Sequence, residues 1–480
     1  MKIIFGTQNL YSSFQNIFSQ NKTVIVVVIV FICLRALSFF TYHIPSLNHS
    51  IAAFFILLYF FICKKNLSLG WIILLFELFL DGSGHFFEFE HFILRTWILG
   101  IFGSLWIWSK IHDKKITLPA SKIQRRLLVG TLVGIVLSTL NGFIHHHAPI
   151  NILQDAILYF FLLLTFPALE FETLKSIHFF TLLKSFLIGS ALFSFITFCI
   201  YSSGLGTLPD SYYHWYRNIA GGKITDLGNH FFRIVTSEHL FIVPVILILA
   251  SMLSEQKKNK KLWIYMALAL FVLILNFSRI YFVGLFLGFF ILLFKNSFKQ
   301  WFFVSVCTTI LFISLFAVTS FVSSRGNSFG LELFGIKMNG TVTPNSDVSG
   351  AIRLAILPDA IASIKAHPWF GSGLAATVTY IDPVTKLSVT RTQFDWGYLE
   401  VLAELGIVGT TLFLLFLFSI LFSLLKLLKT KNMSQTHVAF LRGIFAGAIS
   451  LFIFNLTMPA LFHGFGVLYF VFLLVVIQKR

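Results

Sequence analysis

The chain has 480 residues; 57% are hydrophobic, only 11% are charged, and the mean hydropathy is +0.86. This composition excludes a soluble enzyme and predicts an all-α polytopic membrane protein. The formal net charge of +17 does not indicate nucleic-acid binding, because lysine and arginine cluster in short loops, as they do on the cytoplasmic side of membrane proteins. The four cysteines fall in or beside apolar stretches and give neither a disulfide framework nor metal-ligand spacing.

Apolar segments of membrane-spanning length recur along the whole chain. About 14 of them are long enough, or nearly so, to cross a hydrocarbon core of about 30 Å. Lysine and arginine mark alternate loops, whereas the loops around Pro45, His146 and Pro459 carry none. The positive-inside rule therefore predicts that both termini face the cytoplasm. The segments begin near Val24, Ile51, Leu69, Phe92, Leu127, Ile152, Phe179, Leu240, Leu262, Ile280, Trp301, Tyr398, Val438 and Leu461, the second and third being short.

This topology places two long polar loops on the outer face. It divides the chain into N-terminal transmembrane helices (1–200), a first long loop (201–239), transmembrane helices that carry Ser278 and Arg279 (240–322), a large loop (323–397) and C-terminal transmembrane helices (398–480). Long loops in a protein whose other loops are short usually carry function. The chemistry is therefore expected on the outer face.

Arg279 is an isolated charge between two apolar stretches, residues 262–277 and 280–294. A charged residue near the membrane core costs roughly 2.5–3.5 kcal/mol, so it usually faces a cavity or an anion. The alternative is an arginine that snorkels from a tight turn to the lipid headgroups.

The large loop is predicted to contain an amphipathic helix followed by a glycine-rich turn. From residue 351 to 366 apolar residues recur at helical spacing, with Pro358 suited to a helix start or kink and Arg353 as a polar exception. Such a helix would lie along the outer membrane surface. Residues 367–373 (His-Pro-Trp-Phe-Gly-Ser-Gly) follow, and their glycines allow backbone N–H groups to approach a ligand. The alternative is a plain turn anchored at the interface by its two aromatic residues.

Three carboxylates, Asp395, Glu400 and Glu404, lie at the mouth of the next predicted span. A carboxylate there could act as a general base, with a pKa raised by partial burial. Equally, Asp395 could cap the helix and the glutamates could face solvent in its first turns, where the helix dipole favours acids.

The first long loop combines aromatic residues, such as Tyr212 and Trp215, with Arg217 and Arg233. Aromatic rings suit sugar stacking, and guanidinium forks match phosphate oxygens. The same aromatics also fit the interfacial belt found in membrane proteins generally. Arg233 lies just before an apolar run and is predicted at the level of Arg279. The two arginines therefore form a candidate clamp for a lipid-linked pyrophosphate.

Three features resemble the O-antigen ligase and O-antigen polymerase superfamily of bacterial envelope glycosyltransferases. The first is the pair Ser278 and Arg279 between two spans. The second is Arg353, a helix and then residues 367–373, similar to the family's His-Pro-hydrophobic-hydrophobic-Gly-x-Gly. The third is Tyr398 with Leu399 running into residues 404–409, similar to the family's Tyr-Leu and then Glu-x-Gly-hydrophobic-hydrophobic-Gly. The similarity is concentrated between about residues 262 and 420; elsewhere only hydropathy and topology agree.

The resemblance implies a GT-C-like glycosyltransferase of the bacterial inner membrane, with a periplasmic active site and no metal or other cofactor. Its implied substrate is an undecaprenyl-pyrophosphate-linked oligosaccharide. Membrane lipid is the implied partner, a chain-length regulator protein is a candidate partner that the sequence does not decide, and nucleic acid is not expected. Family arginines bind the pyrophosphate: Arg279 matches one directly and Arg233 is the candidate for the other. Arg217 competes with Arg233, because with Gly228 it fits the Arg-x10-Gly pattern of some polymerases. The further candidates for substrate binding are Arg353, His367, Tyr398 and Glu400.

The ligases place a histidine just before the Tyr-Leu pair as the candidate base, whereas this chain has Asp395 there. This departure favours a polymerase of O-antigen or a related surface polysaccharide, acting in lipopolysaccharide biosynthesis, with Asp395, Arg279 and Arg233 as catalytic residues. One alternative is an O-antigen ligase that transfers polymer to lipid A-core. Another is a flippase or other transporter of lipid-linked oligosaccharide. Transporters usually place charges at the bilayer midplane and use short loops, unlike this chain.

Overall fold

The computed structural model of the protein describes residues 21–80, 85–90, 92–113, 116–171, 176–204, 211–293, 297–335, 348–430 and 433–478. Residues 205–210 of the first predicted long loop and 336–347 of the large loop lie outside these ranges.

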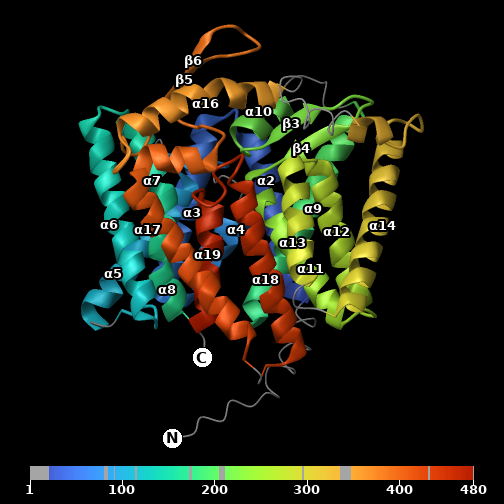
Figure 1. The fold of residues 1–480 in the computed structure, drawn as a ribbon, viewed down its shortest axis with the longest axis horizontal. Coiled ribbons are helices and arrows are strands. Elements are labelled where there is room, and N and C mark those ends of the chain that lie inside the picture. The colour runs from blue at the N-terminus through green and yellow to red at the C-terminus, as the bar shows by residue number, and fades with distance from the viewer. Residues whose placement is uncertain are drawn as a thin grey trace, which may run out of the picture.

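Long helices that run roughly side by side make up most of the molecule (Figure 1). Within the described residues, nine helical stretches are long and apolar enough to cross a membrane, and α4, α13 and α19 are shorter apolar helices. A polytopic helical membrane protein is thereby confirmed, and the figure of about 14 crossings stays a prediction. The helices of the bundle are α2 (Asn21–Thr41), α3 (Pro45–Lys65), α4 (Leu67–Leu80), α5 (Leu94–Asp113), α6 (Lys122–Ile144), α7 (Pro149–Phe160), α8 (Thr165–Glu170), α9 (Ser176–Ser202), α11 (Ile242–Glu255), α12 (Lys260–Asn276), α13 (Arg279–Leu293), α14 (Phe298–Ser323), α17 (Gly397–Leu428), α18 (Gln435–Phe454) and α19 (Gly464–Gln478), with the short 3-10 helices η1 (Phe161–Leu164) and η4 (Ser237–Phe241).

One of the two segments predicted to be short is longer than expected. The second segment forms α3, a helix of 21 residues that starts at Pro45, six residues before the predicted start. A proline in the first turn suits a helix start, because its missing N–H would have no partner there. The third segment, α4, has only 14 residues, as predicted.

The smaller elements gather at one end of the bundle, here called the α16 face (Figure 1). It consists of α10 (Ser211–Asn218), the antiparallel hairpin β3 (Lys223–Asp226) and β4 (Phe232–Val235), α16 (Val348–Ala366), and the hairpin β5 (Val378–Ile381) and β6 (Ser388–Arg391). The registers pair Lys223 with Val235 and Val378 with Arg391. The described parts of both long loops therefore share a face, as predicted, and α19 ends at the opposite end. A further short hairpin joins β1 (Glu88–Phe89) to β2 (Phe92–Ile93).

The large loop folds into a small unit of its own. Helix α16 runs across the end of the bundle, and Pro358 lies inside it rather than at its start. Its inner side packs Ile356 against Val378 of β5 and Phe394 in a separate apolar cluster. The Asp359 carboxylate accepts a 2.6 Å hydrogen bond from the N–H of Thr379, which joins helix to hairpin.

The centre of the bundle is the close pair α11 and α18. The whole of α11 except its last residue is buried. In α18, a Cβ added to Gly443 would lie 2.4 Å from the Cα of Ile248, and one added to Gly447 would lie 2.9 Å from the Cβ of Pro244. Glycines four residues apart let membrane helices approach through their backbones, so this spacing permits the contact.

Candidate functional site

Arg233 and Arg279 come from different segments that meet on the α16 face. Arg233 lies in β4, and its Nε donates a 2.7 Å hydrogen bond to the carbonyl of Asn276. Asn276 is the last residue of α12, and Arg279 is the first residue of α13. The hydrogen bond therefore ties the hairpin that carries Arg233 to the turn that carries Arg279, in agreement with the predicted common level.

The turn between α12 and α13 is sharp because Phe277 adopts a left-handed conformation, with φ of 45°. A bulky residue rarely takes this conformation, and here its ring is buried against Phe231 and Phe316. The helix dipole makes a helix N-terminus electropositive, so an arginine at the first position of α13 does not stabilise the helix. Instead, Arg279 adds positive charge to an end that already favours anions.

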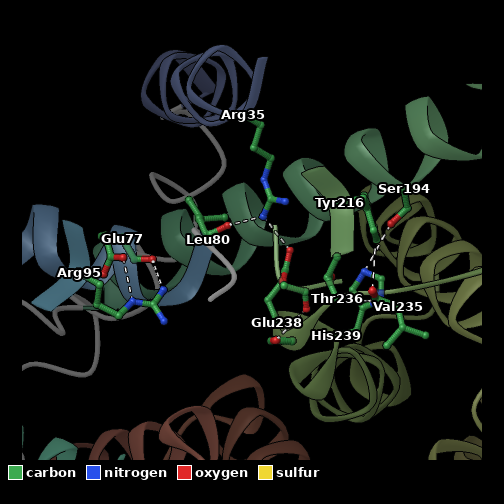
Figure 2. Close-up of polar contacts among 12 residues, drawn as sticks. Arg35, Glu77, Leu80, Arg95, Ser194, Tyr216, Val235, Thr236, Glu238 and His239 are labelled. Atoms are coloured by element: carbon green, nitrogen blue, oxygen red, sulfur yellow. Dashed lines mark hydrogen bonds and ion pairs between the residues drawn. The ribbon is translucent and has the colours of Figure 1, made fainter. Parts of the chain in front are cut away.

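A buried ion pair joins helix α2 to η4 (Figure 2). Arg35, in the middle of α2, donates from Nη2 to Oε1 of Glu238 at 2.9 Å and to the carbonyl of Leu80 at 3.0 Å. Both side chains are almost fully buried, at 2% and 1% exposed. The guanidinium also lies over the rings of Phe31 and Phe193, at 4.3 and 4.1 Å from the ring centroids. A second pair, Arg95 with Glu77 at 2.8 Å, lies nearby in the same view.

His239, the residue after Glu238, links the ion pair to the turn between α12 and α13, here called the arginine turn. Its Nδ1 lies 3.1 Å from Nδ2 of Asn276, and its Nε2 lies 3.4 Å from Oγ of Ser194 in α9. The N–H of Thr236 also points at Nδ1, at 3.4 Å. His239 and Asn276 are both 1% exposed, so these contacts are shielded from solvent.

The glycine-rich turn at residues 367–373 and the segment of α17 at residues 404–409 pack together and form one joint. Helix α17 breaks at Gly406, with φ of 64° and ψ of −175°. The break frees backbone groups, and the turn satisfies them: Ile407 N–H donates to the carbonyl of Pro368 at 2.9 Å, and Ser372 N–H donates to the carbonyl of Ala403 at 2.8 Å. The end of α6 closes the joint, because Nδ2 of Asn141 donates to the carbonyl of Gly371 at 2.7 Å. The turn is thus packed against two helices, and its glycines are needed for that contact.

Glu404 lies beneath this joint and does not face solvent, which corrects one of the two interpretations of the carboxylates. It is 4% exposed, and its Oε2 accepts a 3.1 Å hydrogen bond from the hydroxyl of Tyr159 in α7. The carboxyl group of Asp155 in α7 lies beside that of Glu404. Glu400, one turn earlier, accepts from the N–H of Phe394 at 2.9 Å. In the part of the chain that the structure describes, no three His, Cys, Asp or Glu side chains are grouped so that they could hold a metal ion.

Asp395 precedes α17 but does not cap it. The N-cap residue is Trp396, and Asp395 instead accepts a 2.6 Å hydrogen bond from Nη2 of Arg391. Its side chain is 36% exposed, and its backbone is left-handed with φ of 55°. Asp395 is therefore accessible on the α16 face, as a base would need to be. Tyr398 is an anchor, because its hydroxyl donates to the carbonyl of Phe452 in α18 at 2.9 Å.

The remaining predicted residues lie in or directly after two helices of the α16 face. Arg217 is exposed on α10. Arg353, in α16, accepts at its carbonyl a 3.0 Å hydrogen bond from the indole of Trp396. His367 is exposed beside His145, with ring centroids 4.6 Å apart.

The sugar-stacking interpretation of α10 is not supported for its largest rings. Trp215 and Tyr216 are 1% and 0% exposed, and the indole of Trp215 donates to Oγ of Ser38 at 3.1 Å. Burial raises the pKa of Tyr216 well above its usual range and that of Tyr212 to about 12. These rings fasten α10 to the bundle.

The sequence did not identify Glu238, His239 and Asn276 as site residues. Arg35 was visible as a charge inside an apolar stretch, a recognisable signal for a buried partner. Its partner lies 203 residues away, however, and no local pattern points to it.

Residues 264–414 match the family model described as O-antigen ligase. The matched stretch runs from α12 into α17 and so contains Arg279, Arg353, residues 367–373 and Gly406, whereas Arg233 precedes it. No protein with a curated description matches the chain. The match supports the O-antigen ligase and polymerase superfamily, whose members act as membrane glycosyltransferases on lipid-linked oligosaccharide, and it fits ligases and polymerases alike.

Proposed function

We propose that this protein is a surface-polysaccharide polymerase of the O-antigen ligase and polymerase superfamily, which the family match at residues 264–414 supports. It joins undecaprenyl-pyrophosphate-linked repeat units at the periplasmic side of the inner membrane. In this proposal the α16 face is the side of the protein that faces the periplasm.

The proposed reaction is an inverting glycosyl transfer. A nonreducing-end hydroxyl of one lipid-linked unit attacks the anomeric carbon of the growing chain. A bond forms between that oxygen and the carbon, the bond from the carbon to the phosphate oxygen breaks, and undecaprenyl pyrophosphate leaves with the electron pair. The hydroxyl proton passes to Asp395. Arg279 and Arg233 stabilise the charge that develops on the leaving pyrophosphate.

The observation that carries this proposal is the hydrogen bond from Arg233 to the carbonyl of Asn276. It holds one arginine beside the turn that presents the other at the N-terminus of α13. Two guanidinium groups and a helix N-terminus together suit a pyrophosphate, because each favours phosphate oxygens. Asp395 is supported as the base by its exposure and by its place before α17, in a position where ligases have a histidine.

A ligase is the second candidate, since the family match fits it equally. The aspartate before Tyr398 favours the polymerase. A flippase is less well supported, because the two clamp arginines lie at the ends of their elements on the α16 face rather than in the middle of a span.

The experiment is a deletion strain complemented with the wild type or with Arg279→Ala, in which surface glycan and lipid-linked intermediates are both measured. We expect the deletion strain and the Arg279→Ala strain to carry single repeat units on the normal acceptor and no long ladder, with the variant protein still in the membrane. Complete polymer left on undecaprenyl pyrophosphate would identify a ligase. Repeat units held on the cytoplasmic leaflet would identify a flippase. A normal ladder with Arg279→Ala would refute the clamp.

A further inference from the structure

A chain of buried hydrogen bonds connects the Arg35–Glu238 pair to the arginine turn, and the proposed reaction assigns it no role. Arg233 reaches Asn276 through the Asn276 backbone, and Asn276 reaches His239 through its side chain. His239 follows Glu238, which is paired with Arg35. The chain of contacts therefore runs from α2, through η4, to the end of α12.

The protonation state of His239 follows from its neighbours. The Thr236 N–H can only donate, so the Nδ1 that it faces must be an acceptor, and the proton of the neutral imidazole lies on Nε2, facing Ser194. Nδ1 can then also accept from the Asn276 amide at 3.1 Å. Thr236 directly follows β4, the strand that carries Arg233, and Asn276 is the last residue of α12, two residues before the end of the turn at Ser278. Nδ1 of His239 therefore contacts both segments that carry the two arginines.

The Arg35–Glu238 pair fixes where this imidazole lies. It joins η4 to the middle of α2 and, through the Leu80 carbonyl, to the end of α4. A buried ion pair is weak evidence for stability, because desolvating both charges offsets most of their attraction. What the pair does provide is a defined position for η4.

We infer that His239 and Asn276, held in place by the Arg35–Glu238 pair, are positioning residues that set Arg233 relative to Arg279. This inference rests on the proposed function, because it concerns the geometry of the proposed clamp. Neither residue contacts substrate: they act through the strand and the turn that carry the two arginines. Loss of the His239–Asn276 hydrogen bond leaves both arginines present but no longer fixes their positions relative to each other.

The two nitrogens of His239 can be tested separately. In His239→Asn the amide oxygen takes the place of Nδ1 and can accept from Asn276, whereas in His239→Gln the polar group is displaced to the place of Nε2. Purified protein in phospholipid vesicles is assayed with lipid-linked repeat units extracted from the deletion strain. We expect His239→Gln to lower kcat at least tenfold with little change in KM, and His239→Asn to stay within threefold of the wild type. The melting temperature and gel-filtration profile in detergent report whether each variant is folded.

A second variant tests the same bond from its other side. Asn276→Ala removes the amide and keeps the backbone carbonyl that binds Arg233. It should lower kcat as His239→Gln does, and the double variant should lose no more than either single one, because all three remove one shared bond. Fully multiplicative losses, or equal activity of His239→Gln and His239→Asn, would overturn the inference. So would failure of both His239→Gln and Asn276→Ala to fold, since the network would then be a stability element only.

Failure of the proposed function has a different signature. In that case wild-type vesicles make no polymer from the extracted units, and Arg279→Ala is no worse than the wild type. If the wild type makes polymer and Arg279→Ala does not, the function stands and the variants above decide the positioning role.

Discussion

Gly406 and Gly371 contact each other through their backbones, at the point where α17 breaks. A Cβ on Gly406 would lie 2.4 Å from the nitrogen of Gly371, and a Cβ on Gly371 would lie 2.4 Å from the carbonyl oxygen of Glu404. The two motifs that contain these glycines are far apart in sequence, yet each satisfies the backbone groups that the other leaves open. They are two halves of one joint, so a change in either should affect both.

Gly406→Ala should destabilise the protein. Its φ and ψ lie in a region that only glycine readily occupies, and strain of this kind costs on the order of 1–3 kcal/mol before the clash with Gly371 is added. A lower melting temperature of the purified protein in detergent would report the change. The matched control is Gly100→Ala in α5, where a Cβ would meet nothing within 4 Å. Equal melting temperatures for the two variants would contradict the structural role of the joint.

Arg233→Ala and Arg217→Ala should differ in polymerase activity, although the sequence alone makes both arginines candidates for the second pyrophosphate-binding position. Arg233 is tied to the turn of Arg279, whereas Arg217 is exposed on α10. Removing one donor to a developing charge typically lowers kcat by about 10²–10³, so Arg233→Ala should lose activity to this extent. Arg217→Ala should keep nearly all of it in the vesicle assay. The reverse order would transfer the second clamp position to Arg217.

Asp395→Asn tests the proposed base against its ion pair. If Asp395 accepts the proton, its loss should lower kcat by roughly 10²–10⁴. Arg391→Met breaks the same pair but keeps the carboxylate. It should have a small effect, because exposed ion pairs contribute only about 0.2–1 kcal/mol. Comparable losses in both variants would show that the pair orders the loop and that the base lies elsewhere.

The Arg35–Glu238 pair predicts that a double variant without both charges is more stable than a single variant without one of them. Arg35→Met leaves the Glu238 carboxylate buried without its partner, which typically costs about 3–5 kcal/mol. Arg35→Met combined with Glu238→Met removes both charges and should recover most of the lost melting temperature. The activity of this double variant should remain low, because η4 then loses its fixed position. Additive losses in melting temperature would argue against a direct pair.

The sequence predicted the parts of the site that depend on local pattern. Arg279 between two apolar stretches, the helix of the large loop and its glycine-rich turn all follow from composition and spacing over a few turns, and the structure has each of them. The placement of both described loops on one face followed from the distribution of lysine and arginine.

The parts that could not be predicted depend on contacts between distant segments. Glu404 lies within the first turns of a helix, where acids usually face water, but α7 and the joint cover it. The glycines of residues 367–373 suggested room for a ligand, yet a Cβ on Gly373 would lie 2.0 Å from the nitrogen of Gly142 in α6. Spacing within one segment shows which backbone can approach closely, and only the fold shows what it approaches.

The burial of α11 has a consequence for how the chain is made. Its main neighbour is α18, which is synthesised only after a further 180 residues, counted from Glu255 to Gln435. At about 5–20 residues per second, α11 waits on the order of ten seconds or more for the helix that covers it. During that interval the side of α11 that faces α18 in the finished protein is not yet covered by it. The centre of the bundle is therefore completed late in synthesis, and we expect a chain truncated before α18 to expose apolar surface that the finished protein buries.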